Sequence, residues 1–158
     1  PLSGSIARRR ITEAFDPPGA EEHVHPNTYA AHPTACAAAL ANLRIMEREG
    51  LVENAEKMGL RLLEGLLSRV GHLPIVGEVR GRGLMVCAEL VDPRGSGRPL
   101  DPDKVASIDM KAWNRGAIVY AKRAVVRLAP PLSINAEEVD QLVGIVADCI
   151  EELSAECD

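Results

Sequence analysis

The sequence predicts an α+β fold in which a small, mostly antiparallel sheet has helices packed on one face. Long stretches with apolar residues at helical spacing occur from residue 34 onward and at the carboxyl end. Between them lie short runs rich in valine and isoleucine, interrupted by glycine and proline. These runs are joined by short links, which favours antiparallel strands in a layer covered by helices.

Composition excludes several classes of protein. The 158 residues are 46% apolar and 26% charged, as in folded globular domains, but only 3% aromatic, so the core must consist of aliphatic side chains. Net charge is −5, and the only basic run is Arg8, Arg9 and Arg10. Three charges are too few for a nucleic-acid-binding tail, so we expect no nucleic-acid partner.

The cysteines and histidines indicate no metal site and no disulfide framework. Cys36, Cys87, Cys149 and Cys157 are widely spaced, as expected of reduced, mostly buried thiols in a cytoplasmic protein. His23 and His25 lie in a loop with nothing to complete a coordination shell. No apolar run approaches the roughly 20 residues that span a bilayer, so no membrane association is expected.

Two helices are predicted in the first half of the chain. Residues 1–33 are irregular apart from a short helix candidate at 6–15. Pro33 then begins a helix that Gly50 ends, and its alanines at 37, 38, 39 and 41 allow a neighbouring element to lie close. A second amphipathic helix is predicted over 52–70.

The strands and remaining helices follow. "IVGEVRGRGLMVCAELV" predicts either two strands or one strand with a bulge at 81–83. "AIVY" and "AVVRLAPPL" predict two more strands, the second closed by two prolines. Asp101 is the expected N-cap of a helix that stops at Gly116, and Asn135 with Glu138 forms a capping box for the last helix.

Thr28 is the first candidate binding residue. It stands in "NTYAAHPTA", just ahead of a helix start whose free N–H groups attract anions, phosphate especially. The alternative is a local turn in which Asn27 or Thr28 bonds the backbone and His32 packs against the helix.

Arg127 is the second candidate. It interrupts the apolar strand "VVRLAPPL", and a guanidinium held on a strand suits bidentate capture of a carboxylate. Because Val126 and Leu128 flank it in alternation, Arg127 could equally face solvent on the open side of a half-buried sheet. Arg80 and Arg82 are expected to structure a bulge or bind nearby carbonyls.

Three blocks together resemble the class III pyridoxal-phosphate aminotransferases. They are "TYAAHPTACAAALANLRIMEREGLVENAEKMGLRLLEGL", "PIVGEVRGRGLMVCAELV" and "VVRLAPPLSINAEEVDQLV", and they occur in the family's order over nearly the whole chain. The resemblance implies fold type I, with residues 1–38 forming the edge of the large cofactor-binding domain, including its phosphate-contact loop. Residues 39–158 would form the small carboxyl-terminal domain.

The resemblance also implies roles for individual residues. Thr28 would bond the phosphate of the pyridoxal phosphate held by the other subunit of a homodimer. Ala30 and Ala31 replace the family's usual Ser-Gly pair. Arg127 would bind a substrate carboxylate, although Lys122 or Arg123 occupies the loop where amine-pyruvate members carry a mobile arginine.

The family's catalytic lysine matches no lysine of this sequence. In the family, the lysine that forms a Schiff base with the cofactor lies shortly before a "PLSG"-like step, and this chain begins with "PLSG". We therefore expect that lysine upstream of Pro1, no catalytic residue within the chain, and no activity of the chain alone.

The expected reaction is transfer of an amino group from an amine or amino acid to a 2-oxo acid. A decarboxylase or aminomutase of the same family is an alternative, since the small domain separates these reactions poorly. A freestanding α+β interaction module without catalysis is another. The sequence leaves the identity of the amino donor open.

Overall fold

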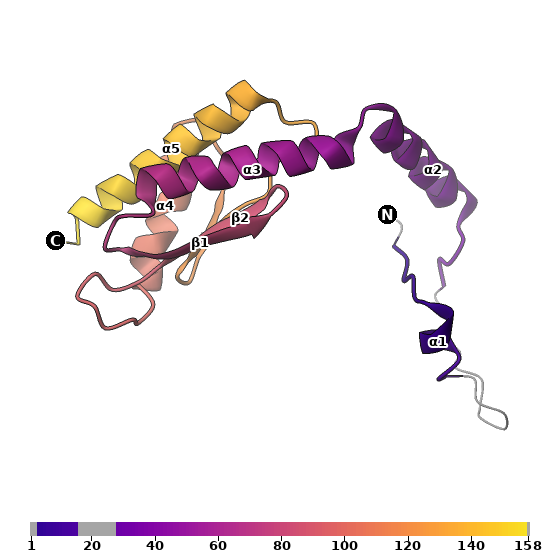
Figure 1. Ribbon diagram of the computed structural model, residues 1–158, viewed down its shortest axis with the longest axis horizontal. Helices are drawn as coiled ribbons and strands as arrows, with labels where there is room; N and C mark the ends of the chain where they lie inside the picture. Colours follow the sequence, from indigo (N-terminus) through magenta and orange to yellow (C-terminus); the bar gives the residue numbers. More distant parts are fainter. Residues whose placement is uncertain (1–2, 16–27, 158) are drawn as a thin grey trace. The chain divides into compact units, whose positions relative to one another are not determined.

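The computed structural model describes residues 3–15 and 28–157 and divides into two compact units, Pro1–Glu49 and Gly50–Asp158. The described residues of the first unit form two helices, α1 (Arg9–Thr12) and α2 (Pro33–Arg48). The second unit (Figure 1) contains α3 (Leu51–Val70), β1 (Val76–Arg82), β2 (Met85–Leu90), α4 (Pro102–Asn114), β3 (Tyr120–Lys122), β4 (Val125–Leu128) and α5 (Ala136–Ala155).

The four strands form one antiparallel sheet in the order β1-β2-β4-β3, which confirms the predicted fold class. Of the two alternatives left open for the first glycine-rich run, the structure shows two strands. They form a hairpin that turns at Gly83, whose φ of 53° is readily adopted by glycine. The irregularity in strand pairing lies between Val76 and Glu78, rather than at 81–83.

Only one face of the sheet is buried. The side chains on this face are apolar and alternate along each strand with exposed or half-buried ones; they are Val79, Val86, Ala88, Leu90, Ala121, Val126 and Leu128. Helix α3 packs against β1 and β2, α4 packs against β3 and β4, and α5 packs against both helices. The prediction of helices on one face is therefore confirmed.

The predicted helix starts are confirmed for the last two helices. The Asp101 carboxylate accepts a hydrogen bond from the Asp103 N–H at 2.9 Å, and Pro102 is the first residue of α4. At α5 both halves of the capping box are present, with Asn135 Oδ1 accepting from the Glu138 N–H and Glu138 Oε2 accepting from the Asn135 N–H. The helix expected over 6–15 is shorter, because only Arg9–Thr12 is helical.

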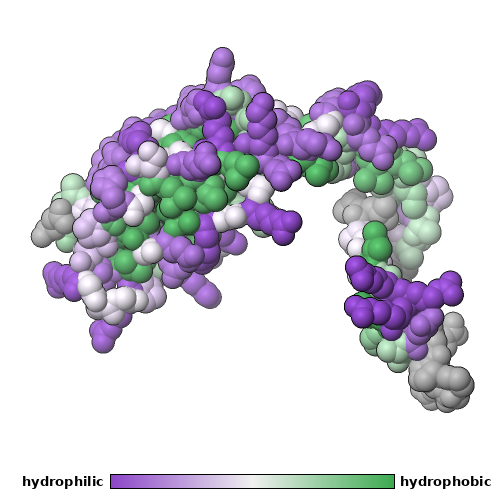
Figure 2. All heavy atoms as spheres, in the orientation of Figure 1, coloured by the Kyte–Doolittle hydropathy of each residue, from purple (hydrophilic) through white to green (hydrophobic). Residues whose placement is uncertain are grey.

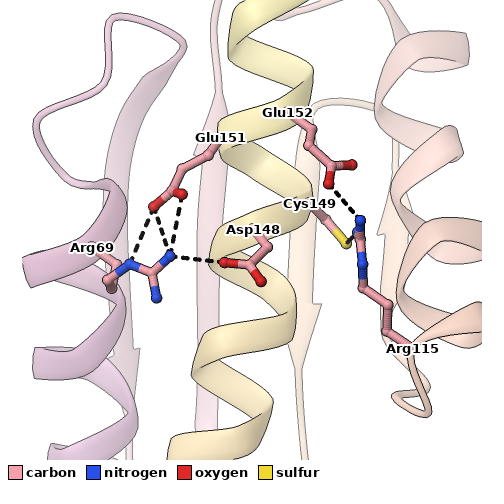
Figure 3. A network of polar contacts seen from close by, with 6 residues as sticks. All are labelled: Arg69, Arg115, Asp148, Cys149, Glu151 and Glu152. Atoms are coloured by element: carbon pink, nitrogen blue, oxygen red, sulfur yellow. Dashed lines mark hydrogen bonds and ion pairs between the residues drawn. The ribbon is translucent and has the colours of Figure 1, made fainter.

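Charged side chains join α5 to α3. Arg61 of α3 forms a bidentate pair with Asp140, at 2.5 and 2.6 Å, and this guanidinium lowers the pKa of the Asp140 carboxyl. Arg69 of α3 contacts Asp148 at 2.8 Å and Glu151 at 3.0 Å (Figure 3). These pairs are partly exposed, so they fix the helix register more than they stabilise the fold.

Cys149 lies at the α4–α5 contact. Its sulfur accepts a hydrogen bond from Arg115 Nη1 at 2.9 Å, and the same guanidinium pairs with Glu152 (Figure 3). Burial raises the pKa of the Cys149 thiol.

All four cysteines are free thiols, but the expectation that most are buried was wrong, since only Cys149 is fully buried.

Helix α2 carries apolar side chains that its own unit does not bury. Leu40, Leu43 and Ile45 are exposed, and no residue of the helix is fully buried. Figure 2 shows the resulting apolar surface on α2.

The boundary between the two units follows Glu49, at the end of α2. The domain boundary expected from the resemblance, between residues 38 and 39, falls within this helix. Assignment of the first unit to a larger domain stays a prediction.

None of the helices in the part of the chain that the structure describes combines the length and hydropathy needed to cross a membrane.

A glycine contact between α3 and the β1–β2 turn provides a test of the packing. A Cβ on Gly59 would lie 2.1 Å from the Gly83 carbonyl oxygen, so Gly59→Ala must push the hairpin away from the helix. We expect a loss of about 1–3 kcal/mol in the free energy of unfolding, measured by urea denaturation.

The matched control is Gly144→Ala in α5, where a Cβ meets nothing within 4 Å. This change should leave stability unaltered or raise it by up to about 1 kcal/mol, because alanine restricts the unfolded chain. Equal effects of the two substitutions would contradict the close approach of α3 and the hairpin.

Candidate functional site

The face of the sheet opposite the helices is the candidate site. This open face consists of the residues that alternate with the buried ones, namely Glu78, Arg80, Arg82, Met85, Cys87, Glu89, Tyr120, Lys122, Val125 and Arg127. In an antiparallel sheet, residues directly opposite one another project to the same side. The strand register therefore determines which of these side chains are neighbours.

One cross-strand row brings two arginines, a thiol and a tyrosine together. Arg80 is opposite Cys87, Cys87 is opposite Arg127, and Arg127 is opposite Tyr120. This central row thus crosses all four strands. It places the predicted carboxylate-binding residue on an inner strand, between a cysteine and an aromatic ring.

Arg80 is neutralised by carboxylates. Its Nη1 lies 2.7 Å from Glu78 Oε2 and 2.7 Å from Glu89 Oε2. The hydrogen bond to Glu89, with the nearby Cys87 and Glu78, raises the pKa of Arg80 above its ordinary value. The predicted role of Arg80 at a bulge or at carbonyls is wrong, because its contacts are these two carboxylates, Glu78 on the same strand and Glu89 across the hairpin.

Arg127 has a different kind of neighbour. Within the described residues it forms no ion pair and no side-chain hydrogen bond. Its Cζ instead lies 4.0 Å from the centre of the Tyr120 ring, within the range of a cation–π interaction. A guanidinium in this position keeps its N–H donors available to an anion.

The central row lines a hollow of about 850 Å³. Its other walls are mainly apolar and include Met85 and Ile118, which are 75% and 80% exposed. The two alternatives left open for Arg127 therefore coincide, since the solvent-facing side of this half-buried sheet is also the side that forms the hollow. An exposed guanidinium beside apolar walls suits a ligand with a carboxylate next to a hydrocarbon portion.

The β3–β4 hairpin determines where Tyr120 lies. Lys122 is opposite Val125, so Arg123 and Ala124 form a two-residue turn, and Arg123 adopts a left-handed φ of 58°. On the outer edge of β3, Asp109 accepts a hydrogen bond from the Ala121 N–H at 2.6 Å and ties the strand to α4. Lys122 shares the open face, but neither it nor Arg123 lines the hollow.

Thr28 belongs to the other unit. It lies in the turn at residues 28–31 that directly precedes α2, it is exposed, and Ala31 of the same turn has a left-handed φ of 53°. The start of α2 has no side-chain cap and no acidic residue in its first turn. Thr28 thus combines an exposed hydroxyl with a nearby uncapped helix start, and both can donate hydrogen bonds to a phosphate.

The structure adds no support for metal binding by the histidines considered in the sequence. His23 and His25 lie outside the described residues. Elsewhere in the chain, over residues 3–15 and 28–157, no group of three or more metal-binding side chains comes together.

Tyr120 is the site residue that sequence reasoning missed. A signal for it exists, because a two-residue turn at Arg123 and Ala124 places Tyr120 and Arg127 at equal distances from the turn. The expected strand "AIVY" lies too early, since β3 begins only at Tyr120.

The comparisons with known proteins agree with one another. Residues 1–150 match the family model for class-III aminotransferases. The chain is 33% identical to 4-aminobutyrate aminotransferase GabT from Escherichia coli, over 96% of this chain and 35% of that protein. It spans about a third of the length of the curated relatives it matches.

Solved structures give the same result. An aminotransferase from Bacillus anthracis matches with a TM-score of 0.79 and 38% identity, over 92% of this chain and 34% of that one. An amine transaminase from an uncultivated Pseudomonas species, solved with pyridoxal phosphate bound, matches with a TM-score of 0.76 and 37% identity, over 95% of this chain and 34% of that one.

The carboxylates around Arg80 allow a test of the hollow. Replacing both, as Glu78→Gln with Glu89→Gln, should release the Arg80 guanidinium into the hollow. We expect succinate to bind up to about fivefold more tightly, the range given by one exposed ion pair, in an NMR titration of the chain.

A control with the same change in net charge is Glu64→Gln with Glu137→Gln. Both residues are exposed on helices and form no ion pair among the described residues. An equal gain in succinate affinity in this variant would contradict a local role of Arg80 and indicate a general charge effect.

Proposed function

The chain belongs to the class-III aminotransferases, and from this we propose that the protein containing it transfers an amino group from an amine or amino acid to a 2-oxo acid. Within that protein, Gly50–Asp158 is the small domain, and its open face contributes to the substrate site. The residues before it contribute a contact to the cofactor. We assign no proton transfer to the side chains of this chain.

The observation that carries the proposal is that the Arg127 guanidinium is exposed and not paired with a carboxylate among the described residues. Its guanidinium is exposed in the hollow, has no carboxylate partner among the described residues and lies over an aromatic ring. A planar guanidinium offers two parallel N–H donors that match a carboxylate. Arg80, which lies on the other side of Cys87 from Arg127, already has carboxylate partners. Arg127 is therefore the arginine of the row that we propose binds the substrate carboxylate.

Pyridoxal phosphate is the proposed cofactor, and the residues before α2 fit its phosphate. The Thr28 hydroxyl makes no hydrogen bond within the described residues, and the α2 start is uncapped. The cofactor, when bound, supplies an electron sink for the substrate carbon that exchanges its amino group. Thr28 would hold the phosphate in place by a hydrogen bond.

We further propose that Thr28 serves the cofactor of a second copy of the protein, in a homodimer. The apolar side chains of α2 that its own unit leaves exposed support an extensive contact of this region with other protein surface. The free thiols are in keeping with a cytoplasmic location.

Arg127→Gln in the full-length protein tests the carboxylate assignment. For an amino donor that carries a carboxylate, we expect KM to rise about tenfold to a hundredfold, because the lost interaction is a hydrogen bond between charged groups. For a primary amine donor without a carboxylate, KM should stay unchanged. Both values are measured in the donor half-reaction alone, in single turnovers followed by cofactor absorbance, because the 2-oxo acid needed for steady-state turnover also carries a carboxylate.

Arg127→Lys is the conservative variant, and it should recover part of the loss, since a lysine keeps the charge but not the bidentate geometry. An Arg127→Gln variant that weakens the half-reactions of both donors equally would contradict the assignment of Arg127 to the carboxylate.

Thr28→Ala tests the phosphate contact. We expect pyridoxal phosphate to bind about tenfold more weakly, as for loss of one hydrogen bond to a charged group, in a titration of the full-length apoenzyme followed by cofactor absorbance. Thr28→Ser keeps the hydroxyl and should bind normally. Equal affinities of the alanine and serine variants would argue against a phosphate bond from this side chain.

A further inference from the structure

Tyr120 has no role in the proposed function so far, yet it is the one described side chain in ring contact with Arg127. The two residues are opposite each other in the β3–β4 register, and the Arg127 Cζ lies 4.0 Å from the centre of the ring. Tyr120 is 46% exposed and lines the same hollow. We infer that Tyr120 is a positioning residue, which holds the Arg127 guanidinium over the open face so that it meets a ligand carboxylate.

The need for positioning follows from the chemistry of arginine. An exposed arginine on a short strand has many rotamers, and ordering it when a ligand binds costs conformational entropy. A neighbouring carboxylate would order the guanidinium but would also compete with the carboxylate of the ligand. An aromatic face attracts the cation without accepting its N–H hydrogen bonds in the plane of the guanidinium. Tyr120 can therefore order Arg127 and leave it able to bind.

Arg80 shows the other outcome on the same row. Two carboxylates hold its Nη1 at 2.7 Å each, so its charge is already compensated. The two arginines thus differ in what orders them, and this difference determines which one is open to an anion. Only Arg127 combines an ordered position with free donors among the described residues of this row.

The position of Tyr120 is itself fixed from two sides. The two-residue turn at Arg123 and Ala124 sets the register of β3 against β4. The hydrogen bond from the Ala121 N–H to Asp109 Oδ1, at 2.6 Å, ties the outer edge of β3 to α4. The ring therefore lies on an edge strand that is held on both edges.

The experiment uses the 158-residue chain and acetate as the probe, so it does not depend on activity. NMR of the Arg127 side chain reports the contact directly, because protons over an aromatic ring are shifted upfield. Acetate titrations of the same samples give the dissociation constant. In Tyr120→Leu we expect the upfield shift to disappear and acetate to bind about two- to fivefold more weakly, the range for an exposed cation–π contact.

Two variants control for indirect effects. Tyr120→Phe keeps the ring and should retain both the shift and the affinity, which a role of the hydroxyl would not predict. Tyr29→Leu makes the same replacement at the exposed tyrosine of the first unit and should change neither quantity. An unchanged Arg127 shift and acetate affinity in Tyr120→Leu would overturn the inference.

The inference rests on the proposed role of Arg127, and Arg127→Gln separates the two. If this variant loses acetate binding while Tyr120→Leu does not, the carboxylate role stands and the positioning role fails. If the unmodified chain and Arg127→Gln bind acetate equally, the carboxylate role itself fails, and with it the positioning role, even where the ring contact is seen.

Discussion

One-sided burial of a four-stranded antiparallel sheet is the constraint on which the other features depend. Every second residue of each strand packs beneath the helices, and the backbone pleat directs the remaining residues to the opposite side. Val126 and Leu128 are buried on the helix side, so Arg127 must project from the open face. The same alternation brings Tyr120, Cys87 and Arg80 to that face. The core thus selects which side chains are available for binding.

The neighbours of the two arginines in the central row differ, and they determine which guanidinium has its charge compensated. Both are exposed guanidinium groups, on strands that β2 separates, and neither is held by burial. Glu78 and Glu89 compensate the charge of Arg80, whereas Arg127 is oriented by an aromatic ring. Exposed ion pairs contribute little to stability, so the effect of the two glutamates is mainly on the electrostatic character of the hollow. The hollow thereby presents one free positive charge on this row rather than two.

Polar contacts of the helices anchor the sheet from the side opposite the open face. Beyond the end of β4, the Asn54 amide of α3 donates to the carbonyl oxygens of Leu132 and Ile134, at 2.7 and 2.9 Å. These bonds tie the segment that follows the Arg127 strand to the first helix of the unit. The polar contacts of α5 with α3 and α4 fix the remaining register, and Figure 3 shows Arg69 of α3 and Arg115 at the end of α4 reaching α5 from opposite sides. A site on regular, anchored strands can keep its geometry better than one on loops.

The sequence by itself determined most of the secondary-structure elements and the candidate binding residues. Periodicity, caps and turn residues are local properties, so the long helices, the antiparallel class and the capping at Asp101 and Asn135 could be predicted. The residues themselves indicated Thr28 and Arg127 as candidates with alternatives left open, and the resemblance added the roles expected of them. Short elements were predicted less well, as the helix at residues 9–12 and the late start of β3 show, because few residues carry the signal and packing decides their limits.

Only the tertiary structure decided how the site residues meet. The sequence could not decide whether Arg127 binds a carboxylate or only faces solvent. Alternation of apolar residues indicates the face on which a side chain lies, but not its neighbours on that face. Pairing of strands distant in the chain brought Arg80 and Tyr120 into one row with Arg127, and made one arginine compensated and the other free. Strand register and cross-strand neighbours are properties of the folded sheet, whereas residue type and spacing are properties of the chain.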